Sequence, residues 1–330
     1  PMEQAYEFEL GRLYDEQGDY AQAFEHFSAG NRIAKKNWDS AHPGPNEFQQ
    51  TIRRKLELAT PDWVARWNRV DLPRSGAATP IFLVGFPRSG TTLLEQVCDS
   101  HPAIKALDEY PAVNAVARKL DELAGGHADA LARLDARQIA DLRNAYFNAV
   151  DQRLTRRADY QLIDKFPLNL VNADLIHRIF PGARFIFALR HPLDVCLSCY
   201  MQDFRLNPGV ANFCELENAA ETYAMVMRLW QRLNELLPLK VHTVRYETLV
   251  SNFEAEVREL VSFCGIPWDD KVLEYASHSR ERAKIKTPSY HQVSRPIYTE
   301  ARFRWERYAE QLEPIRATLE PFIEAFGYGD

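Results

Sequence analysis

The chain has 330 residues, a hydrophobic fraction of 46% and a formal net charge of −6 at pH 7. This length accommodates one large α/β domain with a smaller appendage, and the charge gives no overall basic field of the kind that binds nucleic acid. No apolar stretch approaches the roughly 20 residues that span a bilayer, and the acidic start lacks the apolar segment of a signal peptide.

The N-terminal region, residues 1–72, is predicted to be helical. Residues 7–36 predict two antiparallel helices that turn at Gly18, with small and large residues where the helices cross, as in a tetratricopeptide repeat. An ordinary helical hairpin is the alternative. Because about three repeats are normally needed for a stable stack, the hairpin either ends a longer array or packs directly on the next domain. It is a candidate contact for a homodimer or a protein partner.

Two further helices are predicted at 47–58 and 61–70. The loop 71–80 that follows is rich in Pro, Gly and Ser. We therefore expect a second domain to begin at about residue 73 and to continue to residue 330.

The stretch 80–95 combines a short apolar strand, a turn bounded by Gly85 and Gly90, and a helix start at Thr91. Backbone N–H groups and the helix dipole then point at one place, which predicts a phosphate or sulfate site. The glycine spacing is that of a nucleotide-binding loop, but Thr91 stands at the lysine position and the cation is Arg88. An anion is therefore expected there without a γ-phosphate and its magnesium.

Strands and helices alternate along the rest of the chain, which predicts a parallel sheet flanked by helices. The further strands are expected at 102–107, 160–165, 184–189 and 241–246, and the main helices at 111–123, 136–157, 168–180, 193–204, 212–237, 253–264 and 300–326. Charged residues follow or end these strands: Asp108 and Glu109, then Lys165, then Arg190. The carboxyl ends of parallel strands share one edge, so we expect these side chains at the binding edge of the sheet.

Arg190 and Ser198 are separated by two helical turns. A guanidinium and a hydroxyl so placed are able to share one phosphate; the alternative is a surface arginine and a serine that bonds its own helical turn. The polar stretch 280–296, which contains Arg295, is predicted to be a loop or lid.

The five cysteines are scattered and odd in number, which suits a reduced compartment and predicts a cytoplasmic location. Cys196 and Cys199 form a C-x-x-C pair, a spacing typical of a redox pair or half of a zinc site. Because no second pair has matching spacing and the segment is predicted to be helical, we expect buried free thiols instead.

The run Pro87-Arg88-Ser89-Gly90-Thr91-Thr92 resembles the 5′-phosphosulfate loop of sulfotransferases that use 3′-phosphoadenosine-5′-phosphosulfate (PAPS), in the form found in tyrosylprotein sulfotransferases and their bacterial relatives. Arg190-x-Pro192-x-Asp194 with Ser198 resembles their 3′-phosphate motif. The resemblance covers about residues 80–328. It implies a P-loop-type α/β fold, PAPS as donor without a metal, and a hydroxyl acceptor on a protein tyrosine, a carbohydrate or a small molecule.

The resemblance also implies roles for single residues. The nucleotide-binding set is Arg88, Ser89, Gly90, Thr91, Thr92, Arg190, Ser198, Tyr246 and Arg295. The spacing from Arg88 to Glu109 matches that to the family's catalytic glutamate, Asp108 takes the place of a second acid, and Lys165 matches the lysine after the third strand.

The implied chemistry needs a base and cations. Glu109 is the candidate general base, and Lys165 and Arg88 are candidates to stabilise the charge on the bridging oxygen. The alternatives are a carboxylate at a helix N-terminus for Glu109 and a solvated strand end for Lys165. Rival bases are His101, His127 and His177, although His101 at a helix end is expected to cap it.

Two other functions stay open at this point. A P-loop kinase that uses ATP would employ Asp164, which comes near the end of a strand, as a magnesium ligand. A protein without catalytic activity would use the helical hairpin and the P-loop domain as an interaction scaffold.

Overall fold

The computed structural model describes residues 2–42, 44, 46–67, 78–124, 129–277 and 302–329. These residues form two compact units. One comprises the described parts of Pro1–Arg54, Arg190–Arg228 and Thr299–Asp330, and the other those of Lys55–Leu189 and Leu229–Tyr298. The domain boundary expected at residues 72 and 73 falls outside the described residues and stays a prediction.

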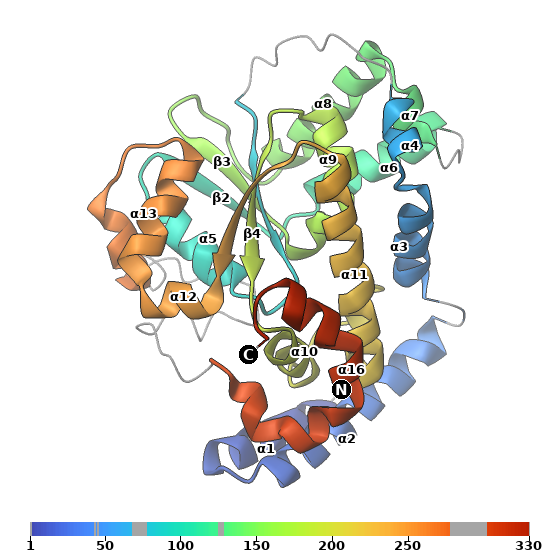
Figure 1. The fold of residues 1–330 in the computed structure, drawn as a ribbon, viewed down its shortest axis with the longest axis vertical. Coiled ribbons are helices and arrows are strands. Elements are labelled where there is room, and N and C mark those ends of the chain that lie inside the picture. Colours follow the sequence, from blue (N-terminus) through green and yellow to red (C-terminus); the bar gives the residue numbers. More distant parts are fainter. Residues whose placement is uncertain are drawn as a thin grey trace. The chain divides into compact units, whose positions relative to one another are not determined.

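The second unit is built on a parallel sheet, which among the described residues has five strands in the order β2-β3-β1-β4-β5 (Figure 1). The strands are β1 (Ile81–Gly85), β2 (Ile104–Asp108), β3 (Gln161–Lys165), β4 (Arg184–Leu189) and β5 (Lys240–Arg245). The neighbours β1 and β4 lead to strands on opposite sides of the sheet. Ligands of such sheets bind outside the carboxyl ends of the strands at this switch point.

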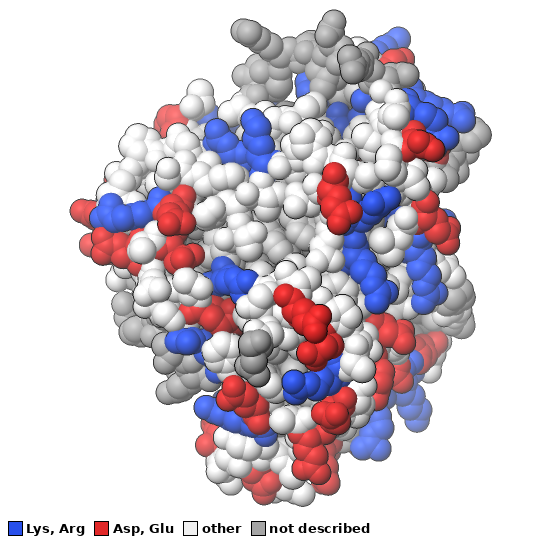
Figure 2. Space-filling model, in the orientation of Figure 1, with Lys and Arg blue, Asp and Glu red and all other residues white. Residues whose placement is uncertain are grey.

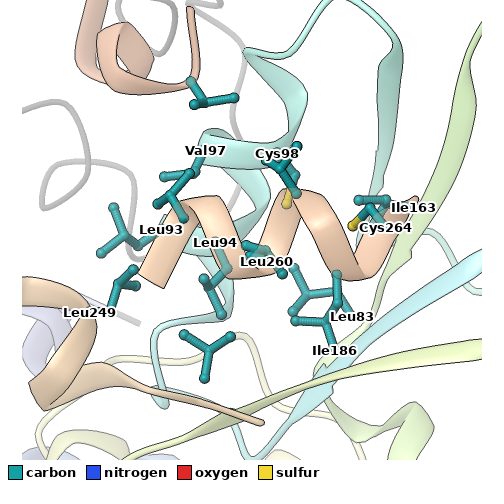
Figure 3. Close-up of a cluster of buried hydrophobic side chains, with 14 of the residues drawn as sticks. Leu83, Leu93, Leu94, Val97, Cys98, Ile163, Ile186, Leu249, Leu260 and Cys264 are labelled. Carbon is teal, nitrogen blue, oxygen red and sulfur yellow. The ribbon is translucent and has the colours of Figure 1, made fainter. Parts of the chain in front are cut away.

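Helices cover both faces of this sheet, as the alternating pattern predicted (Figure 1). On one face α5 (Thr91–Asp99) and α13 (Phe253–Cys264) pack side chains such as Leu94 and Leu260 against Leu83 and Ile186 (Figure 3). Since apolar area removed from water contributes about 25 cal/mol per Å², this buried cluster stabilises the position of α5 on the sheet.

Aromatic side chains fill the other face. Phe82 of β1 lies 5.9 Å from Tyr146 of α8 (Ala136–Asp151), and Phe187 of β4 lies 5.0 Å from Trp230, both between ring centroids. Trp230 belongs to α11 (Leu216–Leu236). The remaining helices of this stretch of chain are α3 (Glu47–Leu58), α4 (Pro61–Ala65), α6 (Ala112–Ala124), α7 (Ala130–Arg133), η1 (Pro167–Asn172), α9 (Ala173–Ile179), α12 (Tyr246–Ser251) and η3 (Asp270–Glu274).

The first unit begins with the predicted helical hairpin, α1 (Met2–Gln17) and α2 (Tyr20–Ala41). Gly18 turns the chain with φ +81°, and glycines allow the two helices to approach. A Cβ on Gly11 would lie 2.8 Å from the ring of Phe27, and one on Gly30 would lie 2.9 Å from that of Phe8. The hairpin is confirmed, and its identity as a tetratricopeptide repeat stays a prediction.

The other helices of the first unit are α10 (Pro192–Tyr200), η2 (Val210–Cys214), η4 (Arg304–Tyr308) and α16 (Ala309–Ala325). The apolar stripe predicted for the last helix lies in the core: Leu312, Ile315 and Leu319 of α16 are each at most 1% exposed. This packing fixes η4, the short helix that precedes α16.

Two helices are shorter than predicted. We expected α8 to continue to residue 157, with basic residues at its end, but it ends at Asp151. Arg156 turns back, pairs with Asp151 at 2.6 Å and lies over the ring of Phe147, 4.4 Å from its centroid. Local ion pairing and ring contact therefore replace a further helical turn. The helix α10 likewise ends at Tyr200 rather than at 204.

Acidic and basic side chains are interspersed over the surface shown in Figure 2. Exposed pairs such as Lys35 with Asp39 contribute only about 0.2–1 kcal/mol each, so the buried clusters dominate stability. Among the described residues no helix is both long and apolar enough to cross a membrane.

Candidate active site

The loop from Gly85 to Thr92 joins β1 to α5 and is called the anion loop below. Gly90 is the N-cap of α5 and has φ +98°, and no side chain caps the helix there. The first intrahelical bond runs from the Leu94 N–H to the Gly90 carbonyl, at 3.1 Å. The N–H groups of the first turn therefore have no intrahelical acceptor, which together with the helix dipole suits an anion.

Ser89 supports this interpretation of the loop. Its residue is 3% exposed, and its Oγ has no hydrogen-bond partner among the described residues. A buried hydroxyl left without a partner costs about 1–3 kcal/mol, which an incoming anion would relieve. A Cβ on Gly85 would lie 2.7 Å from this Oγ and 2.6 Å from the Ala188 carbonyl oxygen, so only glycine fits beneath the loop.

Tyr246 lies against the anion loop. It follows β5 and begins α12, and a Cβ on Gly90 would lie 2.9 Å from its Cδ2 atom. The structure thus brings Tyr246 together with Gly90, as the sequence predicted, although the two are far apart in the chain.

Lys165, Asp108, Glu109 and Glu95 form a second group, the lysine cluster. Lys165 ends β3 and Asp108 ends β2, where the two residues are register partners. The Lys165 Nζ lies 2.6 Å from Asp108 Oδ1 and 2.9 Å from Glu109 Oε1. The lysine side chain is fully buried, whereas those of Asp108 and Glu109 are 22% and 40% exposed. Two of the predicted catalytic residues, Lys165 and Glu109, are therefore in direct contact.

Electrostatics keep Lys165 charged. Burial alone would lower the pKa of Lys165, but the negative charges of Glu109, Glu95 and Asp108 outweigh it and raise that pKa above the ordinary lysine value. Glu95, on α5, is completely buried and accepts a hydrogen bond from the Gln96 amide at 2.9 Å. A buried ammonium with these partners remains a cation at neutral pH.

Backbone strain coincides with the predicted catalytic residues. The described non-glycine residues with positive φ are Arg88 at 71°, Glu109 at 42° and Phe303 at 52°. Such a conformation costs of order 1–3 kcal/mol and persists where the surroundings enforce it. For Glu109 the enforcing contact is its own N–H, which donates to the Lys165 carbonyl at 2.8 Å. Strain of this kind concentrates at functional sites.

Asp164 points away from this group. It precedes Lys165 on β3, is fully buried, and accepts a hydrogen bond from the Tyr146 hydroxyl of α8 at 2.8 Å. Burial raises the pKa of Asp164 to about 7. Successive residues of a strand face opposite sides, so this carboxyl lies on the face remote from α5. That placement disfavours the magnesium ligand of a kinase. No cluster of potential metal ligands occurs among the described residues.

Arg190 directly follows β4, and its side chain is 9% exposed. Its Nη2 lies 3.6 Å from Asp194 Oδ2. Ser198 lies on α10 and is partly buried. Arg190 and Ser198 belong to the first unit and the anion loop to the second, so a shared nucleotide stays a prediction. Arg295 lies outside the described residues.

The rival bases are engaged or lie elsewhere. The Nδ1 of His101 accepts from the Ala103 N–H at 3.0 Å, and its Nε2 contacts the Pro267 carbonyl at 2.8 Å, which confirms the expected capping role. His177 lies on α9, where burial and Arg178 lower its pKa. His127 lies outside the described residues.

The C-x-x-C pair is buried in α10, and both of its thiols are free. Burial raises the pKa of Cys196 well above the ordinary thiol value. A buried, protonated thiol is a poor nucleophile and a poor metal ligand, so the expectation of buried free thiols is confirmed.

Sequence reasoning missed two residues of these groups. Glu95 carried a signal: it is a charged residue four positions after Thr91, in a helix whose neighbouring positions are apolar. Asp194 belonged to a recognised motif but received no role of its own.

Comparisons with known proteins agree on one family. The profile described as "Sulfotransferase family" matches residues 80–270, more than half of the chain. An uncharacterised protein of Aquifex aeolicus is 30% identical over 95% of the chain, which spans 41% of that protein's length. Protein-tyrosine sulfotransferase 1 of Danio rerio is 25% identical over 88% of the chain and 81% of its own length.

A solved structure has the same fold. The sulfotransferase domain of the Synechococcus PCC 7002 olefin synthase superimposes with a TM-score of 0.50 at 22% sequence identity. The match covers 72% of this chain and 91% of that domain. The predicted α/β architecture is thereby confirmed.

Proposed function

The chain belongs to the sulfotransferase family, and we propose that it transfers a sulfuryl group from PAPS to a hydroxyl acceptor. The observation that carries this proposal is the contact between Lys165 and Glu109, 2.9 Å apart at the carboxyl ends of neighbouring strands, together with an anion loop that begins at the end of β1 in the same sheet. A cation, a carboxylate and an anion site of this kind are what metal-free sulfuryl transfer requires.

The anion loop would hold the 5′-phosphosulfate of the donor. The uncapped N–H groups at the start of α5, the unpaired Ser89 hydroxyl and the Arg88 guanidinium supply donors for its oxygens. Tyr246, beside Gly90, would contact the nucleotide. Arg190, Ser198 and Arg295 would bind the 3′-phosphate.

The transfer step follows from these placements. The acceptor oxygen attacks sulfur, the bond from sulfur to the bridging oxygen breaks, and adenosine 3′,5′-bisphosphate leaves with that electron pair. Glu109 takes the acceptor proton, a role for which its 40% exposure leaves it accessible. Lys165 and Arg88 stabilise the negative charge on the bridging oxygen. Lys165 must then exchange its contact with Glu109 for one with the donor.

The acceptor is a hydroxyl group of a second substrate. The relatives named as protein-tyrosine sulfotransferases make a peptide tyrosine the first acceptor to test, ahead of carbohydrates and small phenols. A role of the hairpin in dimerisation or in binding a peptide partner stays a prediction.

The proposal is tested first by binding. Adenosine 3′,5′-bisphosphate at a hundred times its dissociation constant should stabilise the fold by about 2.7 kcal/mol, which a thermal melt detects as a raised Tm. ATP with magnesium should give a smaller shift at equal concentration. A larger shift with ATP and magnesium would instead favour the kinase.

Transfer itself is tested with sulfur-labelled PAPS and a panel of tyrosine peptides, oligosaccharides and phenols. We expect label on at least one class, and none with Lys165→Ala. If the wild-type protein binds the bisphosphate but labels no acceptor in the panel, the scaffold alternative gains support.

A further inference from the structure

Asp194 connects two parts of the first unit. Its side chain is completely buried in α10, and its Oδ2 lies 3.6 Å from Arg190 Nη2. Its Oδ1 accepts a hydrogen bond from the backbone N–H of Trp305 at 2.8 Å. Each carboxylate oxygen thus faces a different partner, and the bond to a backbone group fixes the orientation of the carboxylate.

Trp305 is itself held in place. The ring of His191 stacks on it with centroids 5.0 Å apart and planes inclined by 13°. Burial, Arg190 and Arg316 lower the pKa of His191 to about 4, so this ring is neutral and does not compete with Arg190 for the Asp194 charge.

The short helix η4 extends the connection to the N-terminal hairpin. On either side of Trp305, Arg304 and Tyr308 both contact Asp15 of α1. The distances are 2.5 Å from Arg304 Nη2 to Asp15 Oδ2 and 2.6 Å from Tyr308 Oη to Asp15 Oδ1. Tyr308 is completely buried, and its ring lies 5.2 Å from that of Tyr20 in α2.

We propose that Asp194 is a positioning residue that orients Arg190 toward the 3′-phosphate of the nucleotide, and that Asp15 of the hairpin braces Asp194 through η4. This inference rests on the proposed function. It gives the hairpin a task within the enzyme: it supports the 3′-phosphate site from the side opposite to the ligand.

The physical reason is preorganisation. A free arginine side chain loses rotamer freedom when it binds a phosphate, and this ordering weakens binding. Asp194 holds the Arg190 guanidinium before the ligand arrives. The backbone N–H of Trp305 holds Asp194, so the arrangement depends on where η4 lies and hence on Asp15.

The test compares two nucleotides that differ only in the 3′-phosphate, adenosine 3′,5′-bisphosphate and adenosine 5′-monophosphate, by calorimetry. The readout is the ratio of their affinities in the same preparation, which a general loss of stability does not change. The variants are Asp194→Asn and Asp15→Asn. The matched control is Asp39→Asn, which removes an exposed carboxylate of the same hairpin that pairs with Lys35.

We expect wild type and the control to prefer the bisphosphate equally. Asp194→Asn should reduce the preference about tenfold, as the loss of an orienting partner does at other charged sites, and Asp15→Asn should reduce it by a smaller factor. The monophosphate affinity should stay unchanged in both variants. Thermal melts confirm that each variant is folded, and Asp15→Asn is informative even if Asp194→Asn does not fold.

A wild-type preference in both variants, together with its loss in Arg190→Ala, would overturn the inference and leave the proposed function intact. If the wild-type protein itself does not prefer the bisphosphate, the proposed function fails and the inference with it.

Discussion

Lys165 and Arg190 are both buried cations, and each ends or follows a strand of the same sheet, but their partners differ. Lys165 contacts Asp108 and Glu109, whose side chains are partly exposed. Arg190 contacts Asp194, which is completely buried and also bonded to a backbone N–H.

The difference teaches which cation is able to change partners. A carboxylate with access to solvent is released at little cost, since water replaces the lost contact, whereas separating a fully buried pair leaves an uncompensated charge. We infer that Lys165 exchanges partners during each turnover and that Arg190 keeps its partner. The lysine cluster would therefore control the rate, and Arg190 the affinity for the nucleotide.

The variant with the largest expected effect is Glu109→Gln. It keeps the shape of the side chain but removes the base, so kcat should fall by about 100- to 10,000-fold. Adenosine 3′,5′-bisphosphate affinity should change little, because Lys165 retains Asp108. Steady-state kinetics and calorimetry measure the two quantities.

Glu122→Gln is the matched control for Glu109→Gln. Glu122 is an exposed acid on α6 that pairs with Lys119, so its replacement should change neither quantity. If Glu109→Gln retained more than a tenth of the wild-type rate, the base would have to be another group.

Arg190→Ala should act on binding instead. Charge-assisted hydrogen bonds contribute about 1.5–3 kcal/mol each, so losing the contacts to the 3′-phosphate should weaken nucleotide affinity about 30- to 100-fold. At saturating PAPS the rate should fall much less than in Glu109→Gln. Arg258→Ala, which removes an exposed arginine paired with Glu254, is the control. A large loss of kcat with unchanged affinity would reverse the comparison between the two cations.

Most of the sheet could be predicted from the sequence because its strands are buried on both faces and form short apolar runs. The predicted bounds of β4, 184–189, agree with the structure, and those of β1 differ only at its last residue. The meeting of Lys165 and Glu109 was also predictable, since charged residues at the ends of parallel strands share one edge.

The supporting acids could not be predicted in this way. Asp194 bonds Trp305 111 residues further along the chain, and Asp15 bonds Tyr308 at a separation of 293 residues. No local pattern encodes such pairs, because they depend on which elements pack together. The end of α8 was missed for a related reason: the contacts of Arg156 with Asp151 and Phe147 outweigh helix propensity.

Asp164 offers a sharper comparison with Lys165, its neighbour on β3. Its raised pKa means that between about pH 4 and pH 7 the folded protein holds a proton that the unfolded chain has lost. Stability therefore falls as the pH rises through this window. Asp164→Asn removes the titration, so the wild type should lose on the order of 2 kcal/mol relative to this variant between pH 5 and pH 7.

Urea denaturation at several pH values measures this difference, with the exposed acid Asp159 replaced by Asn as the control. A difference that does not change with pH would show that Asp164 is charged in the folded protein. Burial of an acid next to a hydroxyl would then be as well tolerated as burial next to a cation.

The smallest expected effect is that of Gly90→Ala, which tests how exactly the anion loop is fixed. The residue has φ +98°, and the new Cβ would lie 2.9 Å from Tyr246 Cδ2. Strain and crowding together should destabilise the fold by about 1–2 kcal/mol and weaken nucleotide binding several-fold. Gly182→Ala is the control: a Cβ there meets nothing within 4 Å, so stability should stay the same or rise by about 0.4–1 kcal/mol.

The double variant Gly90→Ala with Tyr246→Ala separates the two causes. If crowding by the ring dominates, removing the ring should make Gly90→Ala almost neutral in that background. If the backbone conformation dominates, the same 1–2 kcal/mol should be lost in both backgrounds, about the cost of one strained residue. Urea denaturation of the four proteins gives the answer. A neutral Gly90→Ala in the wild-type background would mean that the loop is not held in the conformation that presents its N–H groups to the donor.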